Sequence, residues 1–202
     1  MATGDYCTLP ELKADLWPPG STPDSTDDVT LENIITSVSR WIDAYTSRRF
    51  YTTAADETRY YTAPAGGVLF TDDILSITTL KTDEDGDRTY EITWATTDYD
   101  LLPLNASLES QPYSWIEVTP NGAYSFPTSR KGVQIVGKFG YCATASLPQA
   151  IQRACLLQCL RIFKRKDAPF GVISNPFGGD MRVLKDLDPD VQALLDPYRR
   201  VV

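Results

Sequence analysis

The sequence predicts an α+β protein with a helical core of two long and two short helices and an all-β insertion. Apolar side chains recur every three or four residues over residues 29–47 and again over residues 147–165, as in amphipathic helices. Between these segments the apolar spacing changes to two, the period of a strand with one buried face. We therefore assign residues 1–50 and 142–202 to the helical core and residues 51–141 to the β-rich insertion.

A short helix is predicted first. Thr8 and Glu11 have the spacing of a capping box, in which each side chain binds the backbone N–H of the other residue. The helix has one apolar face, formed by Leu9, Leu12 and Leu16. Two prolines and a glycine at residues 18–20 end it.

The strongest local prediction is the long helix over residues 29–47. Its apolar stripe consists of Leu31, Ile34, Ile35, Val38, Trp41, Ile42 and Tyr45. A second long helix is predicted from Leu147 to Arg165, with Pro148 in its first turn. A last short helix begins near Pro189 and is capped by Asp188. Residues 172–179, rich in glycine and proline, are expected to form an extended, mobile loop.

The insertion is predicted to contain five strands, over residues 58–62, 74–82, 89–94, 115–119 and 132–139. Residues 83–87 contain an Asp-Gly pair between two of these strands, which is typical of a hairpin tip.

Charge narrows the class of function. The net charge is −8, which argues against a general nucleic-acid binder, because such a protein needs a basic surface. Residues 1–32 hold seven acidic residues and one basic residue, whereas residues 147–202 hold nine basic and six acidic residues. Such asymmetry suits head-to-tail contacts between copies in a ring, although ordinary solvated surface explains it too. We see neither a membrane-spanning run nor a signal-peptide pattern and expect folding in a cytoplasm.

The four cysteines, Cys7, Cys142, Cys155 and Cys159, are too few for a disulfide framework in a chain of 202 residues. Cys155 and Cys159 share one face of a predicted helix and could share a metal ion. The sequence has no histidine and no CxxC pair, so we favour buried apolar roles and predict no metal.

Two other patterns resemble ligand sites. Residues 132–138 match a phosphate-binding loop up to Lys138, but Phe139 follows where Ser or Thr is required, and the segment alternates as a strand does. Asp83, Asp85 and Asp87 resemble the start of a calcium loop, but Trp94 occupies the position of the essential glutamate. We therefore predict no cofactor.

Catalysis has little support in the sequence. Without histidine, the usual serine or cysteine triads cannot form. The carboxylate pair Asp72 and Asp73 could perform acid–base chemistry, but solvation of a turn is the favoured interpretation. We predict that the protein is not an enzyme.

Three stretches together resemble a known family. Residues 42–50 form a helix end with an arginine pair and an aromatic residue, and residues 136–141 precede a Leu-Pro-Gln-Ala-Ile helix start at 147–151. The third stretch is the ending, residues 191–200. In this order they resemble the head-tail connector (adaptor) proteins of tailed bacteriophages and phage-like gene-transfer particles.

The resemblance implies a structural virion neck protein that assembles in the host cytoplasm as a homo-oligomeric ring, usually a dodecamer. The ring would bind the portal protein, receive the next neck or tail protein during tail assembly, and surround the genomic DNA without specific binding. No membrane contact is implied. In this family the C-terminal segment commonly contacts the portal.

Carried onto this chain, the resemblance points to a portal interface in the tail, which we expect to be mobile from Asp188 onward until docking. The predicted interface combines tail and loop residues: Tyr198, Arg199, Arg200, Val201 and Val202, with Phe170, Val172, Ile173 and Phe177.

Two alternatives stay open. One is another neck or tail component, such as a stopper or a tail terminator. The other is a carbohydrate- or ligand-binding β-domain that uses Trp94, Tyr113 and Trp115 as an exposed aromatic platform. A core position is the favoured interpretation for these aromatic residues.

Overall fold

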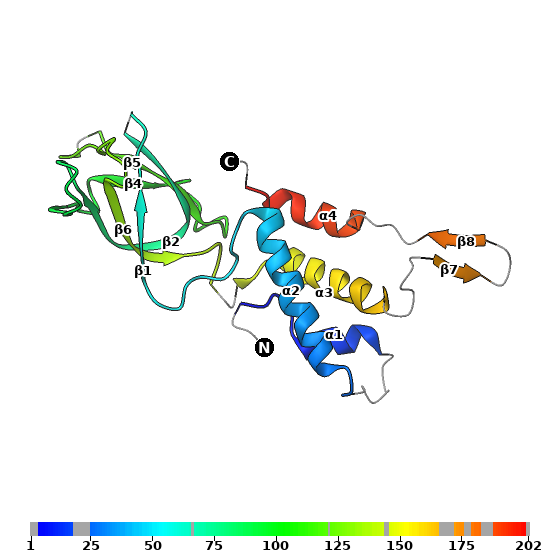
Figure 1. The fold of residues 1–202 in the computed structure, drawn as a ribbon. Coiled ribbons are helices and arrows are strands. Elements are labelled where there is room, and N and C mark those ends of the chain that lie inside the picture. The colour runs from blue at the N-terminus through cyan, green and yellow to red at the C-terminus, as the bar shows by residue number, and fades with distance from the viewer. Residues whose placement is uncertain are drawn as a thin grey trace. The chain divides into compact units, whose positions relative to one another are not determined.

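The computed structural model describes residues 4–17, 25–65, 67–120, 122–143, 146–165, 172–175, 179–182 and 188–200, with only the backbone for 172–175 and 179–182. The chain divides into two compact units (Figure 1). The helical unit consists of Met1–Arg48 and Leu147–Val202, and the sheet unit consists of Arg49–Ser146.

Four α-helices lie in the described part of the helical unit. They are α1 (Leu9–Leu16), α2 (Asp28–Thr46), α3 (Gln149–Lys164) and α4 (Pro189–Leu195), and the 3-10 helix η3 (Asp196–Tyr198) follows α4 directly. The predicted capping box of α1 is confirmed, with the Glu11 N–H 3.3 Å from Thr8 Oγ1 and the Thr8 N–H 2.7 Å from Glu11 Oε2.

Helix α3 contacts α1, α2 and α4, so the apolar faces of the four helices meet around it. Helix α2 contributes Leu31, Ile35, Val38 and Ile42, and α3 contributes Ile151, Ala154, Cys155, Leu156 and Cys159. Leu12 of α1 and Val191 and Leu195 of α4 complete this set of buried side chains. Leu157 and Ile34, predicted within the apolar stripes, are only partly buried.

The sheet unit contains one six-stranded antiparallel sheet with the order β1-β6-β2-β5-β4, in which β3 pairs with β2. The strands are β1 (Glu57–Tyr61), β2 (Val68–Thr82), β3 (Ile92–Thr93), β4 (Tyr99–Leu102), β5 (Tyr113–Val118) and β6 (Val133–Phe139). Strand β2 pairs with β5, β6 and β3 along its length, and its register with β5 shifts between Phe70 and Ile74.

This sheet encloses its own hydrophobic core, formed by Ala63, Leu69, Ile74, Leu80, Trp94, Tyr99, Ile116, Phe126, Val133, Ile135 and Phe139. The Trp94 ring stacks on Phe126 with centroids 4.6 Å apart, and its indole N–H donates to Thr82 Oγ1 at 3.0 Å. The polar edge of a buried tryptophan is thereby satisfied inside the core.

The predicted fold class, a helical core of two long and two short helices with an all-β insertion, is therefore wrong. The chain is α+β overall, but a six-stranded antiparallel sheet with a separate core is a principal part of the fold and not an insertion into a helical core. The reason is that alternating residues of the middle segment bury one another, and a sheet with its own apolar interior needs no helical core beneath it.

The prediction of an extended, mobile loop over residues 172–179 is also wrong. Strands β7 (Val172–Asn175) and β8 (Gly179–Arg182) form a two-stranded antiparallel sheet, with Val172 opposite Arg182 and Asn175 opposite Gly179. Two β-branched residues begin β7, and this strand signal was outweighed in the prediction by the neighbouring glycines and prolines.

Candidate functional site

The C-terminal segment, predicted to contact a portal, is folded onto the helical unit from residue 188 to residue 200. Asp188 caps α4 by accepting the Asp190 N–H at 3.0 Å and pairs with Arg161 of α3 at 3.2 Å. The Tyr45 hydroxyl of α2 donates to Asp196 Oδ1 at 2.7 Å. The Arg199 guanidinium lies 5.2 Å from the centre of the Tyr45 ring.

Two hydrogen bonds to backbone carbonyls hold residues 198–200. Arg48 Nε donates to the Tyr198 carbonyl at 2.8 Å, and the Arg200 N–H donates to the Thr46 carbonyl at 2.9 Å. Carbonyls in the last turn of a helix lack partners within the helix, and the chain end supplies one here. Residues 188–200 are therefore not the free tail that the sequence predicted.

The structure describes the side chains of three of the nine predicted interface residues, Tyr198, Arg199 and Arg200. Phe170, Phe177, Val201 and Val202 lie outside the described residues, and Val172 and Ile173 are described only as backbone of β7.

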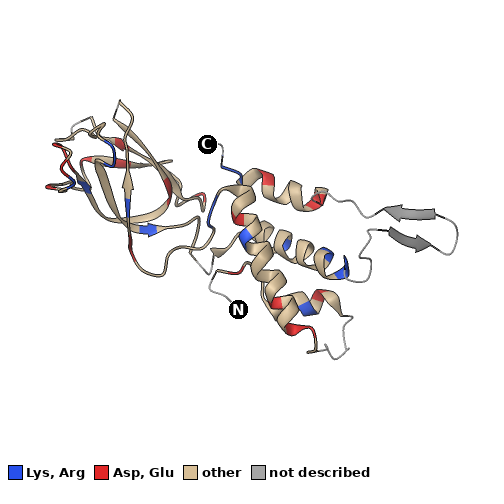
Figure 2. Cartoon of the chain, in the orientation of Figure 1, with Lys and Arg blue, Asp and Glu red and all other residues tan. Residues whose placement is uncertain are grey.

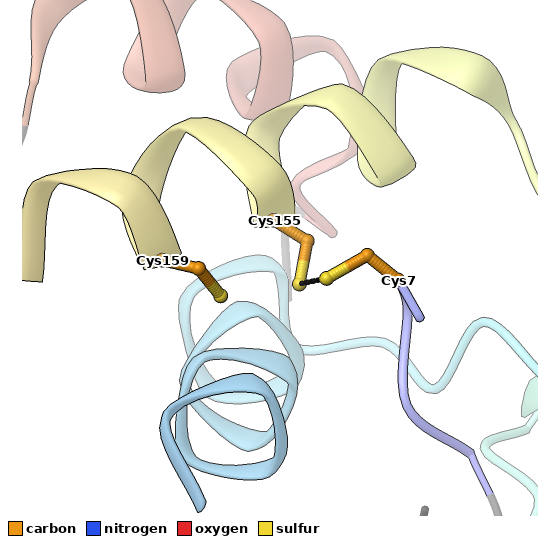
Figure 3. Close-up of side chains that lie close together, drawn as sticks. All are labelled: Cys7, Cys155 and Cys159. Carbon is orange, nitrogen blue, oxygen red and sulfur yellow. Dashed lines mark hydrogen bonds between the residues drawn. The ribbon is translucent and has the colours of Figure 1, made fainter. Parts of the chain in front are cut away.

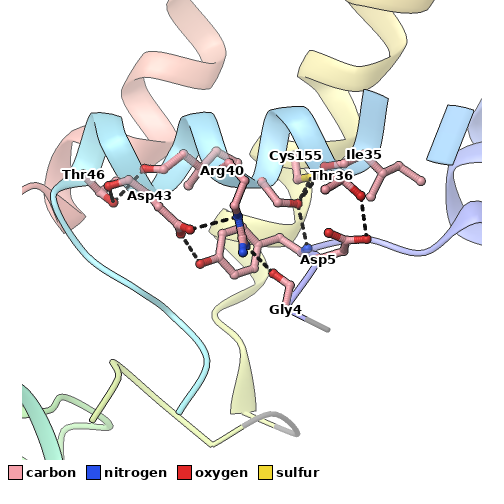
Figure 4. A network of polar contacts seen from close by, with 11 residues as sticks. Gly4, Asp5, Ile35, Thr36, Arg40, Asp43, Thr46 and Cys155 are labelled. Atoms are coloured by element: carbon pink, nitrogen blue, oxygen red, sulfur yellow. Dashed lines mark hydrogen bonds and ion pairs between the residues drawn. The ribbon is translucent and has the colours of Figure 1, made fainter. Parts of the chain in front are cut away.

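The N-terminal segment before α1 is bound along α2 by polar contacts (Figure 4). The Tyr6 N–H donates to Ser39 Oγ at 3.0 Å, and its hydroxyl donates to Asp43, which also pairs with Arg40 at 3.1 Å. Arg40 Nη2 donates to the Gly4 carbonyl at 2.6 Å. Tyr6 is 1% exposed, so the segment is anchored by a buried ring as well as by hydrogen bonds.

This anchoring places Cys7 beside two cysteines of α3 (Figure 3). The sulfur atoms of Cys7, Cys155 and Cys159 all lie within 4.8 Å of one another, and those of Cys7 and Cys155 are 3.4 Å apart. All three are buried free thiols. The sequence indicated the pair on α3 from its spacing, but no local signal could bring in Cys7, which is 148 residues from Cys155.

The three thiols influence one another electrostatically. Hydrogen bonds from Cys159 and Cys7 lower the pKa of Cys155, and burial raises it by less. The bond with Cys155 raises the pKa of Cys159 and of Cys7, since a proton that bridges to a neighbouring sulfur is harder to remove. The cluster therefore favours negative charge on Cys155.

The aspartates predicted at the hairpin tip stabilise the turn between β2 and β3. Asp83 accepts the Gly86 N–H at 2.8 Å and the Arg88 N–H at 2.9 Å. Desolvation raises the pKa of Asp83, but N–H donors led by Arg88 and Gly86 outweigh it, so the pKa lies below its ordinary value. Asp85 and Asp87 likewise accept backbone N–H groups. These carboxylates thus have structural partners.

The other patterns also have structural roles. Residues 133–138 lie within strand β6, as their alternation predicted. Asp72 accepts from Arg59 at 2.8 Å and from the Tyr61 hydroxyl at 3.0 Å, whereas Asp73 is 5% exposed. Trp94 is buried in the sheet core, so it cannot belong to an exposed aromatic platform.

Several charges in the helical unit lie at the ends of helices, while α1 and α2 carry residues of both signs (Figure 2). Acidic residues begin α1 and α2, and basic residues Arg161 and Lys164 occupy the last turn of α3. Part of this asymmetry is paired within the chain, since Arg153 lies 2.7 Å from Asp15. Among the helices that the structure describes, none is long and apolar enough to cross a membrane.

Comparison with known proteins identifies the fold. No protein-family model matches the chain, and no curated protein matches its sequence. Solved structures do match. A chain from the virion of a native gene transfer agent (GTA) particle has a TM-score of 0.58 and 18% identity, with 96% of this chain and 89% of that chain covered.

Two further matches are chains from GTA necks. One, from the neck of an empty particle computed with C6 symmetry, has a TM-score of 0.56 and 19% identity, with 96% of this chain and 89% of that chain covered. The other, from the neck of a native particle computed with C12 symmetry, has a TM-score of 0.53 and 19% identity, with coverages of 87% and 84%. At this level of identity, the shared property is the fold.

Proposed function

We propose that this protein is a structural neck component of a phage-like particle, located in the virion and acting without catalysis. The observation that carries the proposal is the fold shared with a GTA neck chain over 96% of this chain and 89% of that one. Both the helical unit and the sheet unit fall within that coverage, which supports a similar role for the whole chain.

The proposed assembly is a homo-oligomeric ring, the head-tail connector (adaptor) ring. The matched necks were computed with C6 and C12 symmetry, and a twelve-membered ring fits both. Head-to-tail contacts suit a chain whose acidic residues begin α1 and α2 and whose basic residues end α3. Genomic DNA would pass through the lumen, and a net charge of −8 disfavours tight binding of its phosphates.

The proposed portal contact is the C-terminal segment, with Tyr198, Arg199 and Arg200 as its described side chains. Because residues 188–200 are fixed to α2 and α3, this segment would meet the portal as a preformed surface. An aromatic and two arginines are typical of interface anchors. The β7–β8 hairpin and residues 201–202 would extend the contact.

The test combines purified protein with portal-containing heads that lack necks. We expect collars on the heads in negative-stain images and cosedimentation of the protein with the heads. Truncation after Asp196 should abolish cosedimentation while the sheet unit still melts as in the intact chain. A chain that lacks only residues 201–202 serves as the milder comparison. If the chain truncated after Asp196 binds heads as the intact chain does, the portal contact lies on the long helices instead. If the intact protein forms no collar on the heads, the connector role is rejected.

The stopper and tail-terminator alternatives predict another order of addition. A stopper or terminator would bind heads or tails only after a connector is already present. Binding to heads that carry the portal alone therefore favours the connector role, and binding only to heads with a connector favours the alternatives.

A further inference from the structure

The thiols of Cys7, Cys155 and Cys159 form a cluster that the neck role does not use. Their exposed fractions are 3%, 0% and 0%. Packing of the helical core does not by itself require sulfur, because other side chains of similar size would fill the same space. Here three thiols from two distant segments converge on one point (Figure 3).

The separations between the sulfur atoms suit a shared cation. Thiolates bound to one zinc ion at about 2.3 Å lie about 3.8 Å from each other in tetrahedral geometry. The Cys7 and Cys155 sulfurs are 3.4 Å apart, and all three sulfurs lie within 4.8 Å. Shifts of a few tenths of an ångström to about 1 Å would therefore bring them into coordination distance of one ion.

An oxygen donor is also in position. Ser39 Oγ lies 3.7 Å from Cys155 Sγ, close to the roughly 3.6 Å that separates oxygen and sulfur ligands of one zinc ion. This oxygen accepts the Tyr6 N–H and donates to the Ile35 carbonyl, which leaves a second lone pair for a cation.

The supporting structure holds each ligand in place. Cys155 and Cys159 are one helical turn apart on α3, so their side chains share one face. Cys7 lies between Tyr6, which is bonded to α2, and Thr8, which caps α1. A rigid arrangement of this kind is what a structural metal site requires.

We propose that Cys7, Cys155 and Cys159 bind one thiophilic divalent cation, zinc, with Ser39 Oγ as the oxygen donor nearby. Soft thiolate ligands select zinc over magnesium or calcium. The bound ion would join the N-terminal segment to α3 and α2, so metal binding would be coupled to folding of the helical unit. This inference is independent of the neck role, since its test involves no other particle component.

The first experiment measures zinc in the full-length protein. The protein is expressed in zinc-supplemented medium, purified under reducing conditions without chelator, and analysed by mass spectrometry of its metals. We expect about one zinc ion per chain, as in a closed structural site. Refolding with cobalt(II) should give the near-ultraviolet charge-transfer band of thiolate bound to cobalt.

Variants locate the site. Cys159→Ser should weaken zinc binding at least tenfold, since loss of even an outer-shell partner costs about 10–100-fold in metal affinity. Cys142→Ser is the matched control, because Cys142 is also buried but donates to the Phe50 carbonyl at 3.2 Å in the sheet unit. It should retain the zinc content and the cobalt band of the original protein.

Three results would overturn the proposal. The first is zinc in the original protein no higher than in Cys159→Ser. The second is absence of the cobalt charge-transfer band, which decides the matter even if a variant does not fold. The third is a Cys7–Cys155 disulfide in a non-reducing peptide map of protein purified without reductant, which would assign the cluster to oxidation chemistry.

Discussion

Replacement of Gly137 by alanine should selectively destabilise the sheet unit. Gly137 lies in β6 opposite Glu57 of β1 and Ile77 of β2, so strands flank it on both sides. An added Cβ atom would lie 2.2 Å from the Ser76 carbonyl oxygen and 3.1 Å from Ile77 Cα. Ordinary contacts of a Cβ atom are 3.4–4 Å, so β6 and β2 would have to move apart by more than 1 Å.

The expected cost follows from this displacement. Overpacking in a well-packed core costs about 1–3 kcal/mol. Each backbone hydrogen bond weakened between β6 and β2 adds roughly 1 kcal/mol. The total is on the order of 2–4 kcal/mol of unfolding free energy. For a unit of this size each kilocalorie lowers the melting temperature by about 4–8 °C, so a decrease of at least about 8 °C is expected.

Calorimetry together with near-ultraviolet circular dichroism measures this effect. Lys138→Ala is the matched control, because Lys138 is the next residue of β6 and its side chain is exposed. The control should change the unfolding free energy by no more than about 0.5 kcal/mol. If Gly137→Ala melts within about 2 °C of Lys138→Ala, the close packing of β6 on β2 does not exist.

Two further predictions concern the helical unit and the hairpin tip. Ile35→Ala should lower the unfolding free energy of the helical unit by about 2–5 kcal/mol in urea titrations, because Ile35 is fully buried, whereas Ile34→Ala should cost less than half as much. Backbone N–H donors lower the pKa of Asp83 in the folded protein. The ionised Asp83 side chain therefore stabilises the fold above the unfolded pKa of about 3.9, and this stabilisation is lost as the pH falls through the pKa of Asp83 in the folded protein. Asp83→Asn should therefore melt below the original protein at pH 7, and the difference should narrow as the pH falls below the unfolded pKa; a constant difference between the two would contradict this.

Local signals explain why the helices could be predicted. The capping box of Thr8 and Glu11 and the cap of Asp188 fixed the starts of α1 and α4 to the residue. The ends of α2 and α3 lie within two residues of the predicted ones, because apolar periodicity persists over several turns. These signals act within one segment and need no knowledge of the rest of the chain.

The first half of β2 shows where alternation fails as a signal. Phe70 is 65% exposed, whereas Thr71 and Asp73 are buried. Two polar residues thus lie on the buried face beside Leu69, and the apolar Phe70 lies on the exposed face. The acidic pair also looked like a turn, so the strand was predicted to begin only at Ile74. The pairing of this segment with β5 is non-local and was not encoded in its own residues.

The cysteine cluster has a similar explanation. The sequence alone disfavours zinc, because the chain has no histidine and no CxxC pair. The third thiol, Cys7, arrives only through the contacts of Tyr6 with α2. Ligand sets assembled from distant segments have no spacing signature, in contrast to CxxC pairs.

The attachment of the C-terminal segment to α2 leads to a last prediction about docking. If the portal binds residues 188–200 in the conformation described, loosening the segment lowers affinity, because only the attached fraction of molecules is competent. Arg48→Ala removes the donor to the Tyr198 carbonyl, which is worth roughly 1 kcal/mol, or about fivefold in the equilibrium constant between the attached and the released segment. Arg49→Ala makes the same change of charge at an exposed neighbour and serves as the control. We expect weaker cosedimentation of Arg48→Ala with portal-containing heads and unchanged cosedimentation of Arg49→Ala. Stronger binding of Arg48→Ala would mean that the segment must be released before it docks, as a tail that is ordered only on the portal would require.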